Sequence, residues 1–133
     1  MSAEVVERTV VRGSRAPLDA RPSLLLEVPH GATSRAELDA SVARLRGRLP
    51  DGIEDFFFVN TDAGAPELAL AIAQRWVARH EDRVALVLRC RVPRTVVDCN
   101  RVLDPEDRGG LTPGVPPYVR DIDDQVWLRA QHA

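Results

Sequence analysis

The sequence contains no lysine, and all 18 of its basic residues are arginine. A lysine nucleophile or Schiff base is therefore excluded. Only two cysteines occur, Cys90 and Cys99. They are too few for a disulfide framework and lack the close pairing of a zinc ribbon, so we expect two small, buried side chains. No apolar run has the length of a membrane span or of a signal peptide, and we expect a cytoplasmic protein with no membrane partner.

Excess positive charge is also absent. The 18 arginines are outweighed by 20 acidic residues, which gives a net charge of -2, and only 5% of the residues are aromatic. This composition argues against a nucleic-acid-binding protein. The chain has 133 residues, of which 44% are hydrophobic and 29% are charged. These values are typical of a single soluble globular domain.

Apolar runs and turn residues divide the chain into alternating elements. Residues 1–22 form a polar N-terminal segment in which four valines could make an edge strand: Val5, Val6, Val10 and Val11. Strands are predicted for residues 23–28, 55–59 and 83–90, with a further short extended piece at residues 96–97. Residues 104–118 are rich in Pro, Gly and Asp and are expected to form a long loop.

Helices are predicted between and after these strands. Ser34 and Glu37 form a capping-box pattern that opens a helix ending near Leu49. Pro66 suits the first turn of a second helix that ends near His80. A third helix is expected to start at Asp121. The inward-facing residues are expected to be Leu38, Val42 and Leu45 in the first helix, Leu68, Ile72, Trp76 and Val77 in the second, and Ile122, Val126 and Trp127 in the third.

The order strand, helix, strand, helix, strand predicts an α/β fold over residues 23–133, with a largely parallel or mixed sheet. Buried apolar strands of this kind are covered on both faces, as in a three-layer α/β/α arrangement. The third helix is only beginning where the sequence stops. We therefore expect either the N-terminal part of a larger α/β domain or a chain that associates with itself through this helix.

Three polar clusters follow the predicted strands, where sites gather in such sheets. They are residues 29–31 around His30, residues 60–64 around Asp62, and residues 89–101. A His and an Asp at neighbouring strand ends could bind zinc or a similar metal. The arginines of the third cluster could bind a carboxylate by two-point hydrogen bonding. They are Arg89, Arg91, Arg94 and Arg101.

Each of these residues also has an ordinary structural interpretation. His30 could be a hydrogen-bonded loop residue. Asp62 could be the acidic residue that stabilises a helix N-terminus. Asp98 and Arg101 could form a local ion pair. These alternatives stay open on residue type and spacing alone.

Taken together, the three clusters resemble the N-formylglutamate amidohydrolase (N-formylglutamate deformylase) family over residues 23–105. The matching motifs are the Pro-His of VPHGA (residues 28–32), the Asp of DAGAPEL (residues 62–68), and the Asp-x-Asn-Arg of PRTVVDCNR (residues 93–101). The resemblance implies a zinc-carboxypeptidase-like fold. It also implies hydrolysis of a carbon–nitrogen amide bond in a small-molecule carboxylate, giving formate and glutamate in the family.

The resemblance also assigns roles to individual residues. His30 and Asp62 would be metal ligands, with zinc as the cofactor. Arg94 and Asp98 would be catalytic, Arg94 by polarising the scissile carbonyl and Asp98 by holding the arginines in place. The substrate carboxylates would be bound by Asn100 and Arg101. Arg91, which precedes the matching motif in the same arginine cluster, is a further candidate for substrate binding.

The family's downstream zinc-binding His, in an Asp-x-His-Ser motif, is absent from this sequence. His80 and His132 do not fit that position. Two expectations follow. The chain is either a metal-dependent amidohydrolase or its N-terminal portion, or a non-catalytic carboxylate-binding or oligomerising module derived from such an enzyme.

Overall fold

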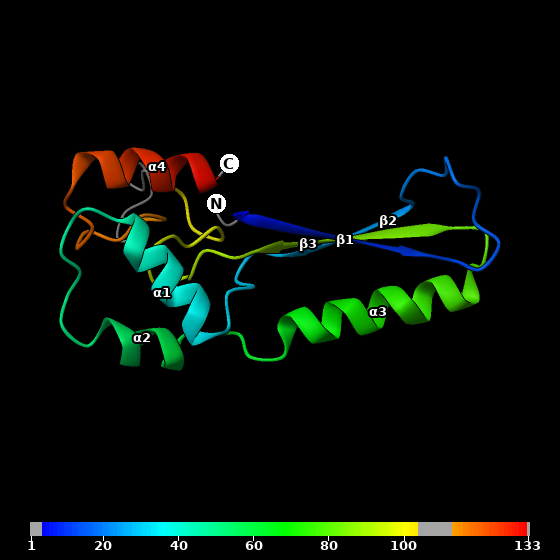
Figure 1. Ribbon diagram of the computed structural model, residues 1–133, viewed down its shortest axis with the longest axis horizontal. Helices are drawn as coiled ribbons and strands as arrows, with labels where there is room; N and C mark the ends of the chain where they lie inside the picture. The colour runs from blue at the N-terminus through cyan, green and yellow to red at the C-terminus, as the bar shows by residue number, and fades with distance from the viewer. Residues whose placement is uncertain (1–3, 104–112, 133) are drawn as a thin grey trace.

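The computed structural model describes residues 4–103 and 113–132 and confirms a mixed α/β fold (Figure 1). Residues 104–112 of the loop predicted over residues 104–118, and the last residue of the predicted C-terminal helix, lie outside the described residues. In chain order, the elements are β1 (Val6–Arg12), β2 (Leu24–Val28), α1 (Arg35–Arg44), α2 (Ile53–Val59), α3 (Ala65–Arg79), β3 (Val84–Cys90) and α4 (Ile122–His132). None of the described helices is long and apolar enough to cross a membrane.

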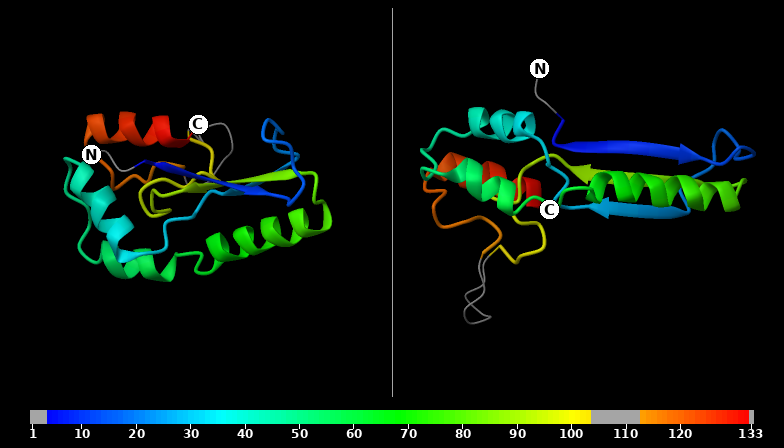
Figure 2. Two further views of the ribbon diagram at one scale, coloured as in Figure 1. Left: turned by 45° about the vertical axis from the view of Figure 1, so that its right-hand side comes forward. Right: turned by 90° about the horizontal axis from the view of Figure 1, so that it is seen from below.

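The three strands form one sheet in the order β1-β3-β2. β2 runs parallel to β3, and β1 pairs with the other side of β3 in the antiparallel direction. The sheet is therefore mixed, and the edge strand predicted from the N-terminal valines is confirmed. The carboxyl ends of β2 and β3 point toward α1, α2 and α4, which gather beyond that end of the sheet (Figures 1 and 2).

A single helix, α3, covers one face of the sheet. Its small residues Ala65, Ala69 and Ala73 let the helix approach the strands closely, and Val77 and partly buried Trp76 complete the contact. Burying a valine contributes roughly 1.5–3 kcal/mol relative to leaving it exposed. The other face has no helix over it among the described residues, so the expected third layer is not observed there.

The predicted apolar face of α3 is partly wrong. Leu68 is 62% exposed and Ile72 is 44% exposed, whereas Ala73 and Val77 are buried. The prediction relied on the large apolar side chains of the helix and did not consider its alanines. The sheet is instead contacted by the alanine-lined face, because the shorter side chains allow closer packing.

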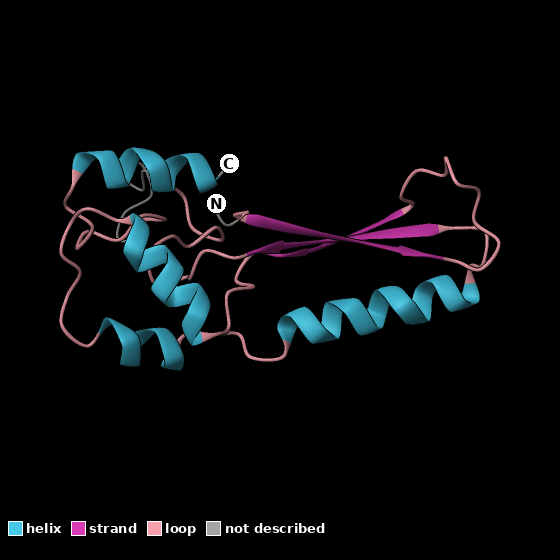
Figure 3. Cartoon of the chain, in the orientation of Figure 1, coloured by secondary structure: helices cyan, strands magenta, loops and turns pink. Residues whose placement is uncertain are grey.

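The segment predicted as a strand at residues 55–59 is wrong, because Asp55 to Val59 belong to helix α2 (Figure 3). The helix begins after Gly52, which has a φ of 82°, a conformation that glycine adopts without strain. Only Phe57 of this segment is buried, and Phe56, Phe58 and Val59 are exposed. A short apolar run does not distinguish a strand from a helix by periodicity.

Helix α1 has the predicted capping box, with Ser34 as N-cap and Glu37 returning the hydrogen bond. It ends at Arg44 rather than near Leu49, because Leu45 adopts an extended conformation. The backbone N–H groups of Arg46 and Gly47 then donate to the buried carboxylate of Asp124 in α4, at 2.7–3.0 Å. These contacts draw the chain away from the helix axis.

A second core lies beyond the sheet, under the loop that follows β3. Val96 and Val97 are fully buried there, in a turn rather than the predicted extended piece, with both backbone N–H groups donating to the carbonyl of Pro93. This core contains six buried residues: Val92, Val96, Val97, Val115, Val119 and Leu128. The buried side chains of this turn therefore anchor the loop at residues 91–101 to the second core.

Candidate functional site

His30 lies at the centre of the candidate site, directly after β2. Its side chain is 5% exposed. Its Nδ1 lies 3.1 Å from Oδ2 of Asp62, and its Nε2 lies 2.8 Å from Oδ1 of Asp98. A carboxylate only accepts hydrogen bonds. A neutral imidazole has one N–H and can donate to only one of these two carboxylates.

Glycine is required immediately after His30. A Cβ at Gly31 would lie 2.4 Å from Cγ of Arg89 and 2.8 Å from the carbonyl oxygen of Cys90. The chain leaving β2 thus passes very close to the end of β3. This close approach brings His30 next to the loop at residues 91–101, in agreement with the expectation that the polar clusters meet where β2 and β3 end.

Asp98 is buried and holds three groups besides His30. Its Oδ2 accepts hydrogen bonds from Nε of Arg94 at 3.1 Å and Nε of Arg101 at 3.4 Å, and its Oδ1 accepts from the backbone N–H of Asn100 at 3.0 Å. Burial opposes ionisation of Asp98, but the hydrogen bonds from Asn100, His30 and Arg94 outweigh it and lower the pKa of the carboxyl. Asp98 therefore stays ionised and orients both arginines. The side chain of Asn100 is itself exposed.

Asp62 approaches His30 from the loop between α2 and α3. Sequence reasoning placed it after a strand, but it follows a helix. Its side chain is 46% exposed and faces His30 rather than capping α3, which has no side-chain cap. Asp62 still lies two residues before the N-cap Gly64, so a favourable contact with the helix dipole stays open. The structure also brings His30 and Asp62 within the reach of a shared ligand.

A cavity of about 270 Å³ lies beside Asp98. Arg94 and Arg101 line it together with Asp98, giving two positive groups against one negative group. Its walls are completed by the polar residues Asn60 and Thr95 and by largely apolar side chains: Phe56, Pro113, Pro116, Pro117 and Tyr118. The Tyr118 hydroxyl donates to the carbonyl of Thr95, and burial raises the pKa of Tyr118 to about 12. The charges of this cavity favour a carboxylate.

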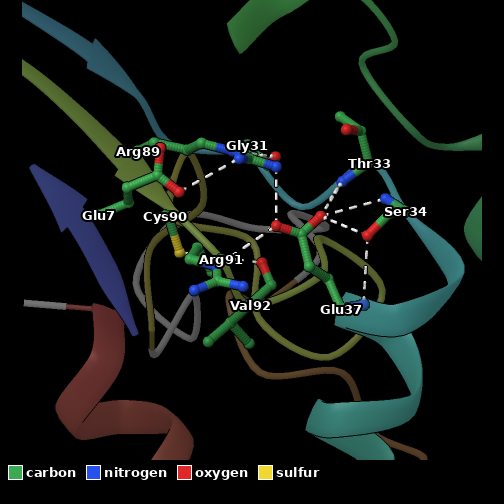
Figure 4. A network of polar contacts seen from close by, with 9 residues as sticks. All are labelled: Glu7, Gly31, Thr33, Ser34, Glu37, Arg89, Cys90, Arg91 and Val92. Atoms are coloured by element: carbon green, nitrogen blue, oxygen red, sulfur yellow. Dashed lines mark hydrogen bonds and ion pairs between the residues drawn. The ribbon is translucent and has the colours of Figure 1, made fainter. Parts of the chain in front are cut away.

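Arg91 is not part of this cluster. Its Nε lies 3.4 Å from Oε1 of Glu37, and it lines a separate cavity of about 420 Å³ with Arg44 and Trp127. Arg89 joins the same network, with Nη2 at 2.7 Å from Oε1 of Glu37 (Figure 4). The arginines at residues 89–101 therefore divide into two groups. Arg94 and Arg101 face Asp98, and Arg89 and Arg91 face Glu37.

Glu37 is the residue whose importance the sequence showed only in part. The capping box predicted its contact with Ser34, and the structure adds a hydrogen bond from the backbone N–H of Thr33 and the two arginines (Figure 4). Burial opposes its ionisation, but the hydrogen bonds from Thr33 and Ser34 and the charge of Arg89 together lower the pKa of Glu37. Glu37 and Arg89 are 52 positions apart in the sequence, so no local sequence pattern predicts their contact.

The two cysteines are free and partly buried rather than fully buried. A hydrogen bond from Cys99 lowers the pKa of Cys90 to about 7, although burial opposes ionisation. The same contact and burial raise the pKa of Cys99. Cys90 ends β3, and Cys99 follows Asp98 in the loop at residues 91–101.

The donor set at His30 fits a divalent metal ion in part. The 3.1 Å between Nδ1 of His30 and Oδ2 of Asp62 is close to the spacing of two ligands around one zinc ion. The hydrogen bond between Nε2 and Asp98 has the form of the outer carboxylate contact that orients metal-binding histidines. Within residues 4–103 and 113–132, no group of three or more His, Cys, Asp or Glu side chains could hold a metal. His30 and Asp62 are therefore two candidate ligands, without a third among the described residues.

Comparisons with protein-family models, with curated proteins and with solved structures found no match to this chain. The site is therefore defined by its own geometry. It consists of a buried histidine between two carboxylates, beside a cavity lined by two arginines.

Proposed function

We propose that the chain acts in the metal-dependent hydrolysis of a carbon–nitrogen amide bond in a small-molecule carboxylate, in the manner of the N-formylglutamate amidohydrolases that its motifs resemble. The observation that carries this proposal is the contact of buried His30 with Asp62 on Nδ1 and with Asp98 on Nε2. The zinc-carboxypeptidase-like architecture and the cytoplasmic location belong to the same proposal.

In this proposal His30 and Asp62 hold zinc. The Nε2–H of His30 donates to Asp98, which fixes the tautomer that leaves Nδ1 free to bind the metal. When bound, zinc supplies the Lewis acidity that activates water and stabilises the oxyanion of the tetrahedral intermediate.

Arg94 and Arg101 bind the substrate. Each contacts Asp98 through Nε. This contact orients the guanidinium groups, which line the cavity and pair with a substrate carboxylate in two-point fashion. Arg94 is the nearer of the two to Asp98 and, in this proposal, polarises the scissile carbonyl of the substrate. The backbone N–H of Asn100 keeps Asp98 in place.

Zinc content is the first test of this function. We expect about one zinc per chain after incubation with zinc and removal of the excess, measured by elemental analysis. Zinc is expected to be lost in His30→Ala and in Asp62→Ala, because each removes one of two protein ligands. His80→Ala is the matched control, since His80 is exposed at the end of α3 and is expected to leave the zinc content unchanged. Equal zinc content in wild type and His30→Ala would contradict the proposal.

A non-catalytic carboxylate-binding module is the second candidate function. It is favoured by the cavity, where two arginines outnumber the single carboxylate of Asp98. In this case the metal-free protein binds glutamate or N-formylglutamate in isothermal titration calorimetry. We expect the heat to be lost in Arg94→Ala and kept in Arg91→Ala, because Arg91 lines the other cavity. Absence of heat with any dicarboxylate, in a protein that binds zinc, would exclude this candidate.

A further inference from the structure

The sheet face opposite α3 has no described helix over it (Figures 1 and 2). Exposed apolar side chains lie on this face together with the charged side chains of Arg8, Arg12 and Glu27. The register of the strands arranges its side chains in rows across the sheet. One row consists of Val10, Leu86 and Leu25, and the next row consists of Arg8, Leu88 and Glu27. Val10 is 54% exposed and Leu25 is 52% exposed. Exposed apolar side chains on an open sheet face are unfavourable in water and mark an interaction surface.

Of the three charged residues on this face, Arg12 donates a hydrogen bond to the carbonyl of Pro17, and the positions of Arg8 and Glu27 indicate a suitable partner. Arg8 lies on edge strand β1, Glu27 lies on the opposite edge strand β2, and both pair with Leu88 of the central strand in one row. Both side chains are exposed, and neither has an ion-pair partner among the described residues. The row is thus positive at one edge of the sheet, apolar in the middle and negative at the other edge.

From this arrangement we propose that the open sheet face binds the same face of a second copy of this chain. The two-fold axis would lie between the two sheets, parallel to β3. Rotation by 180° about that axis places β1 of one copy over β2 of the other at the same height along the strands. Arg8 then faces Glu27 of the second copy, Val10 faces Leu25, and Leu86 and Leu88 each face their own counterparts.

Other orientations match the face less well. A two-fold axis within the interface but perpendicular to the strands places β1 over β1 and β2 over β2, so that Arg8 and Glu27 lose their opposite charges. Charged groups in such an interface contribute mainly to specificity and to the choice of register. Two sheets packed face to face lie about 10 Å apart, which arginine and glutamate side chains can bridge.

The expected dimer is weak. Three short strands cover less than the roughly 800 Å² per partner of a standard stable interface. We therefore expect a reversible equilibrium, observable by sedimentation velocity over concentrations from about 10 μM to about 1 mM. The site around His30 lies beyond the end of the sheet, so the zinc content is expected to be the same in the monomer and the dimer.

A charge-exchange experiment tests this proposal. Arg8→Glu and Glu27→Arg are each expected to be monomeric, because each places like charges opposite one another twice per dimer. A 1:1 mixture of the two variants is expected to form a heterodimer, because both contacts then join opposite charges. The double variant is expected to dimerise like wild type for the same reason. Arg75→Glu on exposed α3 is the matched control, which dimerises like wild type.

Three results would overturn the proposal. The first is a wild-type chain that stays monomeric at about 1 mM. The second is a wild-type dimer that Arg8→Glu leaves intact, which includes a dimer formed through Ile122, Val126 and Trp127 of α4. The third is a mixture of the two single variants that stays monomeric although each variant has the circular dichroism spectrum of the wild-type fold.

Discussion

Replacement of Glu37 by alanine is expected to lower the free energy of unfolding by about 3–5 kcal/mol, the usual cost of removing one partner from a buried ion pair. Glu37 is 7% exposed and accepts hydrogen bonds from five donors. Its loss leaves the partly buried guanidinium of Arg89 with Glu7 as its one acidic partner among the residues that the structure describes. It also removes the capping box that begins α1. Urea denaturation with circular dichroism measures the effect.

Asp39→Ala is the matched control for Glu37→Ala. Asp39 lies in the same helix and pairs with Arg35 at 2.8 Å, but both side chains are more than half exposed. An exposed pair four residues apart in a helix contributes about 0.3–0.5 kcal/mol. A loss in Glu37→Ala no larger than that in Asp39→Ala would contradict the stabilising role of the Glu37 network.

The pH dependence of stability has a definite sign. The folded-state pKa of Glu37 lies below its usual value of 4.5, so its stabilising contribution is fully present above pH 4.5 and is lost as the pH falls below it. Glu37→Gln, which cannot ionise, is expected to be less stable at pH 7 and to lose less stability between pH 7 and acid. The loss of stability in acid that remains in Glu37→Gln is expected to come in part from Asp98, whose pKa is also lowered.

Local signals predicted strands β2 and β3 and the starts of helices α1 and α3, but they mistook α2 for a strand. Strands β2 and β3 correspond to the runs SLLLEV and RVALVLRC, because apolar segments of this length between turns favour buried strands. The starts of α1 and α3 were predicted from Ser34 and Pro66, which act within the first helical turn. These features depend on residues three or four positions apart and need no knowledge of the rest of the fold.

The site was predicted less completely, because its contacts are long-range. His30 and Asp98 are 68 positions apart. The convergence of His30 and Asp62 was expected from the family resemblance and from a predicted strand before Asp62, which is helix α2 in the structure. The sequence also could not show which arginines pair with Asp98 and which pair with Glu37. Arg89, Arg91, Arg94 and Arg101 have the same side chain, and their partners depend on which acidic residue lies across from each in the folded chain. The close approach at Gly31 and the buried turn at residues 96–97 decide this division.

The orientation of α4 shows how one buried polar residue misleads a pattern. Ile122 and Val126 form an apolar pair at helical spacing, so the sequence predicted that they face inward. They are 75% and 63% exposed. The buried face instead contains Asp124 and Leu128. Because Asp124 is charged, the pattern of hydrophobic residues in the sequence does not indicate that this face is buried. Burial of Asp124 is compensated by the backbone N–H groups of Arg46 and Gly47.

Leu128→Ala is accordingly expected to destabilise the fold by about 2–5 kcal/mol, the range for large-to-small changes in a packed core. Leu128 is fully buried against Val96 and Val97, whereas Ile122 is exposed, and Ile122→Ala is expected to change stability by about 0.5 kcal/mol or less. Urea denaturation of both variants measures the difference. Because Val96 and Val97 support the turn before Asp98, Leu128→Ala is also expected to weaken zinc binding at His30, and Ile122→Ala is not. Equal destabilisation by the two substitutions would show that α4 packs through its other face.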